Sequence, residues 1–386
     1  MKSQRNISSW IRVFLACCCL FGLMDSLAAT DEPSMQVLMT EDVSAKASLD
    51  EVLAGQLVFH PINIQSQTNL GSTDSAFWLR IRLENLTNRP LIRWLVIGPP
   101  RLRHISLFEF TDSRWQETRG GFAEPFSSRA IPTLSQAFER DLPAHSVQEL
   151  LVRVSSETML MIQPRLYKPE QLMYQEWQAV RTIYFISGVL VLALLFGILL
   201  ALFTHERVFL VYGLAALFYI LIFWGISGLA FRELWPDSPG WALHSIGFFI
   251  ALSLVMLLWT HRLLLNAPRY LDRILQLLIS VFLLLAILML LSSSYYRILT
   301  LLLMTLSFVV TLGSPVLGFF AWRRGVLFYG YGFATYTLPW QLSQLYYIVG
   351  VNWLNPIPLP FFLYGIRLEH YILYLQSLSK KEPLIL

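Results

Sequence analysis

Long apolar segments dominate the second half of the chain. Seven of them, each of roughly 20 residues, follow one another after residue 181 with short connections. About 20 apolar residues cross the hydrocarbon core of a bilayer as a helix, and a helix satisfies its backbone groups within its own segment. The pattern predicts seven membrane helices, at Thr182–Phe203, Val208–Ala230, Ala242–Leu263, Ile274–Leu291, Ile298–Ala321, Val326–Val349 and Ile357–Gln376.

A soluble helical core is the alternative for these segments. Soluble helices keep a polar stripe, whereas Phe185–Phe203 and Ile274–Leu291 have almost no polar residues. We therefore expect an all-α seven-helix transmembrane bundle over residues 182–376, with six or eight helices as the alternative counts. Residues 377–386 are then a short tail.

The preceding half alternates between apolar and polar positions. In Phe77–Glu84 the odd-numbered residues are all apolar, and three of the four even-numbered ones are charged. This is the period of a half-buried strand. Further strand-like runs are separated by turn residues, at 91–97, 104–110, 149–154 and 159–166. Short strands at this spacing predict an all-β domain over residues 29–170, built as an antiparallel sandwich without long helices.

The segment between the two halves, residues 171–181, has a mixed pattern. Leu172, Tyr174, Trp177 and Val180 lie close to helical spacing, and aromatic residues gather at the level of the lipid headgroups. We expect a short helix or linker that enters the first membrane helix and transmits movement of the outer domain.

The first 28 residues have the pattern of a secretory signal peptide. Three basic residues precede the apolar run Val13–Leu23, and Ser26-Leu27-Ala28 offers small residues for cleavage after Ala28. An uncleaved eighth helix and a lipoprotein signal at Cys17 are the alternatives. All three cysteines, Cys17–Cys19, lie in this stretch, so the mature chain would have neither disulfides nor a thiolate metal site.

Basic residues predict the orientation of the helices. If the β domain is exported, eight basic residues lie at cytoplasmic ends or loops, against Arg232 and Arg297 outside. The eight are Arg207, Arg262, Arg269, Arg273, Arg323, Arg324, Lys380 and Lys381. The pattern predicts a multi-pass membrane protein with an exported β domain and a cytoplasmic C-terminus.

Composition narrows the functional classes. The 386 residues are 55% hydrophobic and 14% charged, whereas soluble domains carry about 25% charged residues. The net charge of +4 is small, and a nucleic-acid binder needs a clustered basic face. We expect membrane lipids as partners and no nucleic acid.

A series of short motifs, each in its own place in the chain order, runs along both halves of the sequence. They are Phe77–Asn85, Gly98–Leu102, Pro125–Arg129, Leu151–Ser156, Tyr212, Gly228–Ala230, Leu234–Pro236, Gly365 and Glu369. By these motifs the sequence resembles the bacterial seven-transmembrane receptors with diverse intracellular signalling modules, and its outer half resembles their second type of extracellular domain. The resemblance implies a jelly-roll domain similar to carbohydrate-binding modules and a role in signal transduction.

The sequence departs from that family at two points. Members usually continue into a histidine kinase, a diguanylate cyclase or a phosphatase, whereas this sequence ends soon after the seventh predicted helix. It is either a receptor that uses a separate signalling protein, such as a kinase or cyclase, or a piece of a longer receptor. Gly120-Gly121 also stands where relatives often have Gly-Asp.

Candidate ligand-binding residues lie mainly in the irregular stretch 114–129. A sugar needs aromatic faces flanked by hydrogen-bond donors, and loops on a rigid sandwich are common binding positions. The candidates are Trp78, Trp115, Arg119, Phe122, Phe126 and Arg129. In the alternative, Phe122 and Phe126 pack on the sheet and the arginines are solvated, while Trp78 either lines a groove or is buried under a loop.

Polar residues inside the predicted helices form a second group of candidates, because ionisable groups are costly within a membrane. They are His244, Gln341, Gln344, Glu369 and His370. Structural hydrogen bonding between helices is the alternative role. The outer segments Trp235-Pro236 and Pro356–Pro360 are also expected to dock against the β domain.

No catalytic motif occurs in the exported half, where the histidines are scattered and no nucleophile elbow or phosphate loop is present. We expect no enzyme activity, no cofactor and no metal. The sequence favours a receptor that senses a glycan or small molecule. A non-signalling protein that binds envelope polysaccharide is the alternative, and a transporter is a third class.

Overall fold

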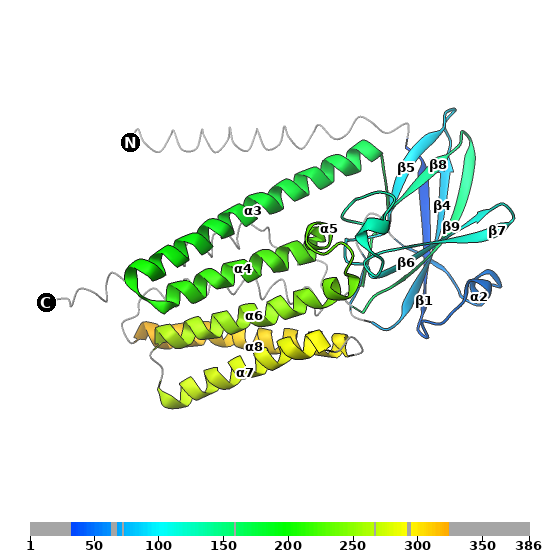
Figure 1. Ribbon diagram of the computed structural model, residues 1–386. Helices are drawn as coiled ribbons and strands as arrows, with labels where there is room; N and C mark the ends of the chain where they lie inside the picture. The colour runs from blue at the N-terminus through cyan, green and yellow to red at the C-terminus, as the bar shows by residue number, and fades with distance from the viewer. Residues whose placement is uncertain are drawn as a thin grey trace, which may run out of the picture.

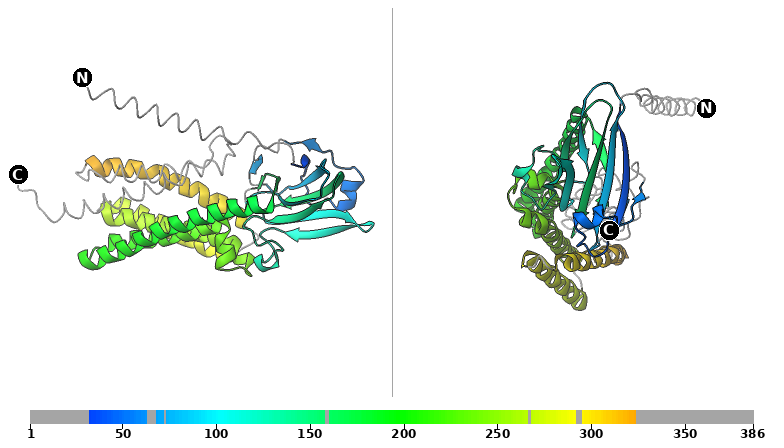
Figure 2. Two further views of the ribbon diagram at one scale, coloured as in Figure 1. Left: turned by 90° about the horizontal axis from the view of Figure 1, so that it is seen from above. Right: turned by 90° about the vertical axis from the view of Figure 1, so that its right-hand side faces the viewer.

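The computed structural model of the protein describes residues 32–62, 68–71, 73–157, 160–265, 268–291 and 295–323. Within these residues a β domain is followed by long helices, and the β domain lies against one end of the helix bundle (Figure 1, Figure 2). The predicted signal peptide and the last two predicted membrane helices lie outside the described residues. So do Gln341, Gln344, Glu369, His370 and the segment Pro356–Pro360.

The β domain consists of antiparallel strands in three sheets. A six-stranded sheet has the order β2-β1-β4-β9-β6-β7, a three-stranded sheet has the order β11-β5-β8, and β10 pairs with β3. The strands are β1 Ser34–Asp42, β2 His60–Pro61, β3 Thr68–Gly71, β4 Ala76–Asn85, β5 Leu91–Val96, β6 His104–Thr111, β7 Arg114–Gly120, β8 Ala137–Leu142, β9 Ser146–Ser155, β10 Leu160–Ile162 and β11 Arg165–Tyr167.

One apolar core lies between the sheets. The predicted strand at Phe77–Glu84 is β4, and its odd-numbered residues are buried in this core together with Leu95 of β5 and Phe138 of β8. Because the core takes side chains from sheets on both sides, the predicted antiparallel β domain is confirmed. The jelly-roll connectivity stays a prediction.

A short helix that the sequence analysis did not anticipate covers the outer face of the six-stranded sheet. This helix, α2 Leu49–Leu53, begins at a capping box in which Ser48 and Glu51 exchange hydrogen bonds. Val52 of α2 and Leu151 of β9 enclose Trp78, which is 1% exposed and stacks on Phe108 at 5.6 Å between ring centroids. The tryptophan is therefore buried.

The helical half follows directly from β11. Its helices are α3 Pro169–Thr204, α4 Arg207–Ser227, α5 Leu229–Glu233, α6 Pro239–Leu265, α7 Arg269–Leu291 and α8 Tyr296–Arg323. In the described part of the chain, α3, α4, α6 and α7 are long and apolar enough to cross a membrane. The long helices correspond to the first five predicted segments, with two corrections at their ends.

The first correction concerns the second predicted helix, which ends three residues early. Gly228 adopts φ +81°, a left-handed conformation that favours glycine, and it terminates α4 at Ser227. The chain then turns into the short helix α5. Residues 229 and 230 are therefore not part of a continuous membrane span.

The second correction concerns the segment 171–181, expected as a short helix or a linker, which is helical but forms one continuous helix, α3, with the first membrane segment. Pro169 occupies the first turn, where its missing N–H costs nothing, and the helix continues for 36 residues to Thr204. At 1.5 Å per residue its length is about 54 Å, more than the roughly 30 Å hydrocarbon core. The N-terminal third of α3 therefore projects from the membrane toward the β domain.

Helices α3 and α4 approach each other closely through two glycines. A Cβ atom at Gly197 would lie 2.8 Å from the carbonyl oxygen of Phe209 and 3.1 Å from the Cα atom of Gly213. Small residues let membrane helices pack backbone against backbone. Gly197 and Gly213 therefore set the crossing of α3 and α4.

The ends of the helices agree with the predicted orientation. The connection between α3 and α4, at His205–Glu206, lies at the end of the bundle remote from the β domain, as do the C-terminus of α6 and the N-terminus of α7 (Figure 1). At that remote end Arg262 donates from Nε to Asp272 at 2.5 Å. The cationic ends of the described helices thus lie opposite the β domain.

Candidate functional site

The segment between β7 and β8, residues 121–136, attaches the β domain to the helices; we call it the docking loop. Its residues Phe122 and Phe126 are 3% and 8% exposed and pack on Phe231 of α5. The ring centroids of Phe122 and Phe126 lie 4.7 Å and 5.9 Å from that of Phe231. We call the docking loop, α5 and residues 234–237 together the joint.

Polar contacts accompany this aromatic packing. The backbone N–H of Phe126 donates to the carbonyl oxygen of Pro236 at 2.7 Å, and the hydroxyl of Ser127 donates to the carboxylate of Asp237. The prediction that Trp235-Pro236 docks against the β domain is thus confirmed at Pro236. The directional bonds determine how the docking loop sits on the segment after α5.

Arg129 fixes the shape of the docking loop from within. Its Nη1 donates to the carbonyl oxygens of Thr133 and Leu134 at 2.7 and 2.9 Å, and its guanidinium lies over the ring of Phe126, 4.7 Å from the centroid. Burial lowers the pKa of Arg129 to about 10, so the side chain stays charged at neutral pH. Its contacts lie within the joint.

The projecting part of α3 also contacts the docking loop. The N–H of Leu134 donates to Oε1 of Glu176 at 2.5 Å. Leu172, one turn earlier on α3, is buried with Val96 of β5 and Ile131 of the docking loop. The loop is therefore held by α3 on one side and by α5 on the other.

The base of the docking loop rests on the segment that precedes β6. Phe122 and Ala123 donate from their N–H groups to the carbonyl oxygens of Leu102 and Arg103 at 2.9 and 2.8 Å. Gly121 has φ +98°, and a Cβ there would lie 2.5 Å from the carbonyl oxygen of Arg103. Only glycine fits this turn, so the Gly120-Gly121 pair has a structural reason in this chain.

Glu157 holds Arg103 in place beneath the loop. Its carboxylate lies 2.9 Å from Nε of Arg103 and 3.5 Å from Nε2 of His104. Burial alone would raise the pKa of Glu157, but the hydrogen bond with His104 and the charge of Arg103 outweigh it and hold this pKa below its usual value. Glu157 is therefore more stable as a carboxylate in the folded protein than in the unfolded chain.

This arrangement predicts an acid-sensitive contribution to stability. Because the folded-state pKa is depressed, the contribution is present above the ordinary value of 4.5 and is lost as the pH falls through the folded value. We expect Glu157→Gln to lower the unfolding temperature at pH 7 and to flatten its decline below about pH 4.5. Thermal unfolding of the full chain at several pH values measures both. The exposed Glu41→Gln is the control, and an equal acid decline in Glu157→Gln and wild type would contradict the assignment.

A further contact links the two halves away from the docking loop. Arg297, near the start of α8, donates from Nη2 to the carboxylate of Asp74, just before β4. Gly228 also approaches Pro100 so closely that a Cβ would lie 2.9 Å from the proline Cβ. The β domain thus touches the helices at more than one point.

The structure separates the six ligand-binding candidates. Phe122, Phe126 and Arg129 belong to the joint, which corrects both earlier interpretations, because the rings pack on the helices rather than on the sheet or on a ligand. Trp78 lies beneath α2 and offers no open face. Trp115 and Arg119 lie on the edge strand β7, where Arg119 is exposed and Trp115 is half-buried against the cluster beneath α2.

The surface around Trp115 has an aromatic and a charged part. Trp115 packs edge-on against Phe110, its partner across the β6–β7 hairpin, at 5.5 Å between centroids. Phe110 is 59% exposed. Arg119 forms an ion pair with Glu117, with Nε and Oε1 3.2 Å apart.

His244, the one intramembrane candidate that is described, contacts the ring of Tyr296 edge-on at 5.2 Å between ring centroids.

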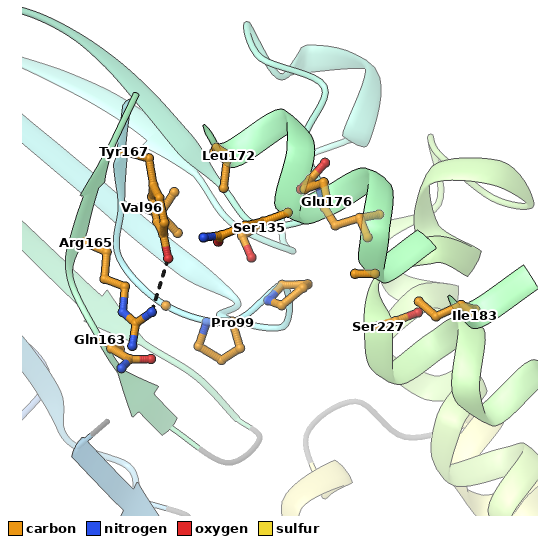
Figure 3. Close-up of a pocket in the computed structure, with 15 residues that line it drawn as sticks. Val96, Pro99, Ser135, Gln163, Arg165, Tyr167, Leu172, Glu176, Ile183 and Ser227 are labelled. Atoms are coloured by element: carbon orange, nitrogen blue, oxygen red, sulfur yellow. Dashed lines mark hydrogen bonds between the residues drawn. The ribbon is translucent and has the colours of Figure 1, made fainter. Parts of the chain in front are cut away.

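A pocket of about 430 Å³ lies between the three-stranded sheet and α3. Figure 3 shows residues of β5 and β11 on one side of it and residues of α3 on the other, with Ser227 of α4 beside Ile183. Glu176 and Leu134 of the joint contribute to its lining. The pocket therefore belongs to both halves of the protein.

In the residues that the structure describes, no group of three or more His, Cys, Asp or Glu side chains could hold a metal ion.

Three residues of the joint, Phe231, Asp237 and Glu176, were not predicted from the sequence. Their signals were an apolar residue after a helix-ending glycine, and acidic residues within otherwise apolar or aromatic segments.

The fold and the joint define a multi-pass membrane protein whose β domain is docked on the ends of its helices. Residues 32–168 match the family described as 7TMR-DISM extracellular 2, and residues 181–374 match the family described as 7TM diverse intracellular signalling. The chain belongs to this family of seven-transmembrane receptors with diverse intracellular signalling modules. The family resemblance inferred from the motifs is thereby confirmed.

The family match also covers residues that the structure does not describe. It covers the sixth predicted helix and all but the last two residues of the seventh, and it makes the β domain an extracellular sensor domain of a membrane receptor with a signalling role. No curated protein sequence matches the chain.

Proposed function

We propose that the protein is a receptor of the bacterial inner membrane whose periplasmic β domain binds a ligand and passes a change of position through the joint to the helices. The packing of Phe122 and Phe126 on Phe231 carries this proposal, because these rings join the two halves directly. Movement of the β domain must then either move α5 or break the aromatic contact.

The continuity of α3 supports the same route. The helix begins two residues after β11, contacts the docking loop through Glu176 and runs on to the remote end of the bundle. A ligand drives such a change only if it binds the two arrangements with different affinity. The joint supplies the contacts that can differ between them.

For the ligand we propose a glycan, bound at the β6–β7 hairpin. The exposed ring of Phe110 and the half-buried ring of Trp115 form a pair beside the charged side chains of Arg119 and Glu117. A sugar ring has apolar faces that stack on aromatic rings and polar edges that accept and donate hydrogen bonds. Of the earlier candidates, Trp115 and Arg119 are those that fit this role.

For the output we propose a separate signalling protein, such as a kinase or cyclase, that reads the cytoplasmic ends of the helices. The C-terminus is cytoplasmic in this proposal, in agreement with the cationic helix ends remote from the β domain. The protein itself acts as a receptor, without enzyme activity or cofactor.

A disulfide across the joint tests the coupling. Ser127 and Asp237 are hydrogen-bonded, and the natural cysteines are confined to Cys17–Cys19. We expect envelope glycan fragments to change hydrogen exchange at residues 204–207 of the full chain in nanodiscs. The Ser127→Cys, Asp237→Cys disulfide should suppress this change, and its reduction should restore it.

The matched control is a disulfide between Gln36→Cys and Arg82→Cys, which pair within the six-stranded sheet and do not span the joint. It should leave the response intact. Glycan binding at Trp115 without any change at residues 204–207 would favour the alternative, a non-signalling protein that holds envelope polysaccharide. A response that survives the joint disulfide would contradict coupling through the joint.

A further inference from the structure

The pocket between the three-stranded sheet and α3 has the size of a small-molecule site. Its volume is about 430 Å³, within the range of roughly 300–1,000 Å³ that ligand pockets occupy. It lies away from the β6–β7 hairpin, on the other sheet of the β domain. Its lining extends from β11 to the first membrane residues of α3 (Figure 3).

The two ends of the pocket differ in chemistry. At one end are the side chains of Arg165, Gln163 and Tyr167, with Nη1 of Arg165 3.4 Å from the Tyr167 hydroxyl. At the other end Ile183 and Ala179 of α3 present apolar side chains. In Figure 3, Arg165 and Gln163 lie on the side opposite Ile183.

The guanidinium of Arg165 has a charge available for a ligand. Among the described residues, no carboxylate lies within ion-pair distance of it. Glu176, the acidic residue of the described pocket lining, accepts instead from the N–H of Leu134 in the docking loop. Within the protein the guanidinium meets only neutral partners, the side-chain oxygen of Gln163 at Nη2 and Nε and the hydroxyl of Tyr167 at Nη1. An anion beside Arg165 would therefore bond to the remaining N–H groups or replace a neutral acceptor by a charged one, and it would gain charge-assisted hydrogen bonds in either case.

The apolar end of the pocket lies at the membrane surface. Arg181 is the last charged residue of α3 before the uncharged stretch 182–204. Tyr174 and Trp177, one to two turns earlier, are 62% and 58% exposed, as expected for aromatic residues among lipid headgroups. Ile183 therefore stands where the hydrocarbon layer begins, and Arg165 faces the aqueous side.

We propose that this pocket binds a small anionic amphiphile with one alkyl chain, such as a fatty acid or a lysophospholipid. Its carboxylate or phosphate lies against Arg165, and its chain runs past Ala179 and Ile183 toward the lipid. The amphiphile enters from the outer leaflet. The lining includes Glu176 and Leu134, whose hydrogen bond joins α3 to the docking loop, so an occupant contacts both partners of that bond. The regulatory role of the occupant rests on the proposed function, whereas its binding does not.

A photoreactive fatty acid tests the site. The full chain in phosphatidylcholine nanodiscs is irradiated with diazirine-labelled hexadecanoate, and the labelled residues are mapped by mass spectrometry. We expect labelling within residues 163–183. It should fall about tenfold in Arg165→Gln, which removes the charge-assisted bonds, and by a similar factor in Ala179→Trp, which fills the pocket. Arg82→Gln removes an exposed arginine of the six-stranded sheet, outside the pocket lining, and should not change it.

Competition separates the amphiphile from a simple anion. Unlabelled dodecanoate should displace the probe, whereas acetate and inorganic phosphate should not. Displacement by phosphate at similar concentration would overturn the proposal in favour of an anion site. Labelling unchanged by both Arg165→Gln and Ala179→Trp would overturn it in favour of general partition into the helices. Either failure leaves the disulfide experiment at the joint unaffected, so the two proposals fail separately.

Discussion

Replacing Phe231 by alanine is expected to release the docking loop from the helices while the sheets of the β domain stay folded. Phe231 is 2% exposed, and it forms the surface on which Phe122 and Phe126 pack. Removing a buried phenylalanine side chain costs about 3–5 kcal/mol. Hydrogen exchange of residues 121–129 should rise strongly, with protection of β4 and β9 unchanged.

The matched control for this experiment is Phe110→Ala. Phe110 is an aromatic residue of similar size, but it is 59% exposed on β6, so its loss should leave exchange in the docking loop unchanged. Equal exchange at residues 121–129 in the Phe231→Ala variant and the wild type would show that the aromatic contact does not hold the joint. Loss of protection throughout β4 and β9 would show instead that the β domain depends on the helices for its own folding.

Replacing Gly197 by leucine is expected to separate α3 from α4 and to destabilise the bundle. Even the Cβ atom would lie 2.8 Å from the Phe209 carbonyl oxygen, and backbone cannot move aside as a flexible side chain does. Overpacking of this kind costs typically 1–3 kcal/mol and more where the backbone is involved. The unfolding temperature in nanodiscs and the yield of monodisperse protein should both fall.

Gly188→Leu provides the control on the same helix. A Cβ atom there would have no neighbour within 4 Å, and leucine is as apolar as the lipid around it. This variant should behave like the wild type. Equal loss of stability in Gly188→Leu and Gly197→Leu would attribute the effect to glycine in α3 generally rather than to the crossing with α4.

Regular elements of the fold were predictable because their side-chain periods are strong. The alternation in Phe77–Glu84 identified β4 and its buried face, and the long apolar segments identified α3, α4, α6, α7 and α8. These patterns reflect burial in one core or in lipid, and each can be read within a single segment. Element ends were less predictable, as Gly228 shows, because a left-handed glycine at position 228 interrupts an apolar run without changing its composition.

The aromatic packing of the joint could not be predicted from local sequence patterns as the strands and helices could. Phe122 and Phe126 lie in an irregular loop, where an aromatic ring can pack on its own sheet, on a ligand or on another domain with the same local sequence. What decides the outcome is Phe231, more than 100 residues away in the chain. Local periodicity carries no information on such a pairing.

The burial of Trp78 under a short helix could have been predicted from the sequence. The alternation of β4 placed it opposite the core, which made a groove and a covering element equally reasonable. The spacing of Ser48 and Glu51 is that of a capping box, and it announces a helix start before Leu49. That short helix is part of the cover over the tryptophan.

The length of α3 has a mechanical consequence. A straight helix of about 54 Å that is held at one end by Glu176 and Leu172 behaves as a lever with its fulcrum at the close crossing of Gly197 and Gly213. The crossing lies near the remote end of the helix, so the arm toward the β domain is the longer one. In the proposed signalling role, a displacement of a few ångströms at the β domain would therefore give a smaller displacement, through the same angle, at the end of α3 beyond Gly197.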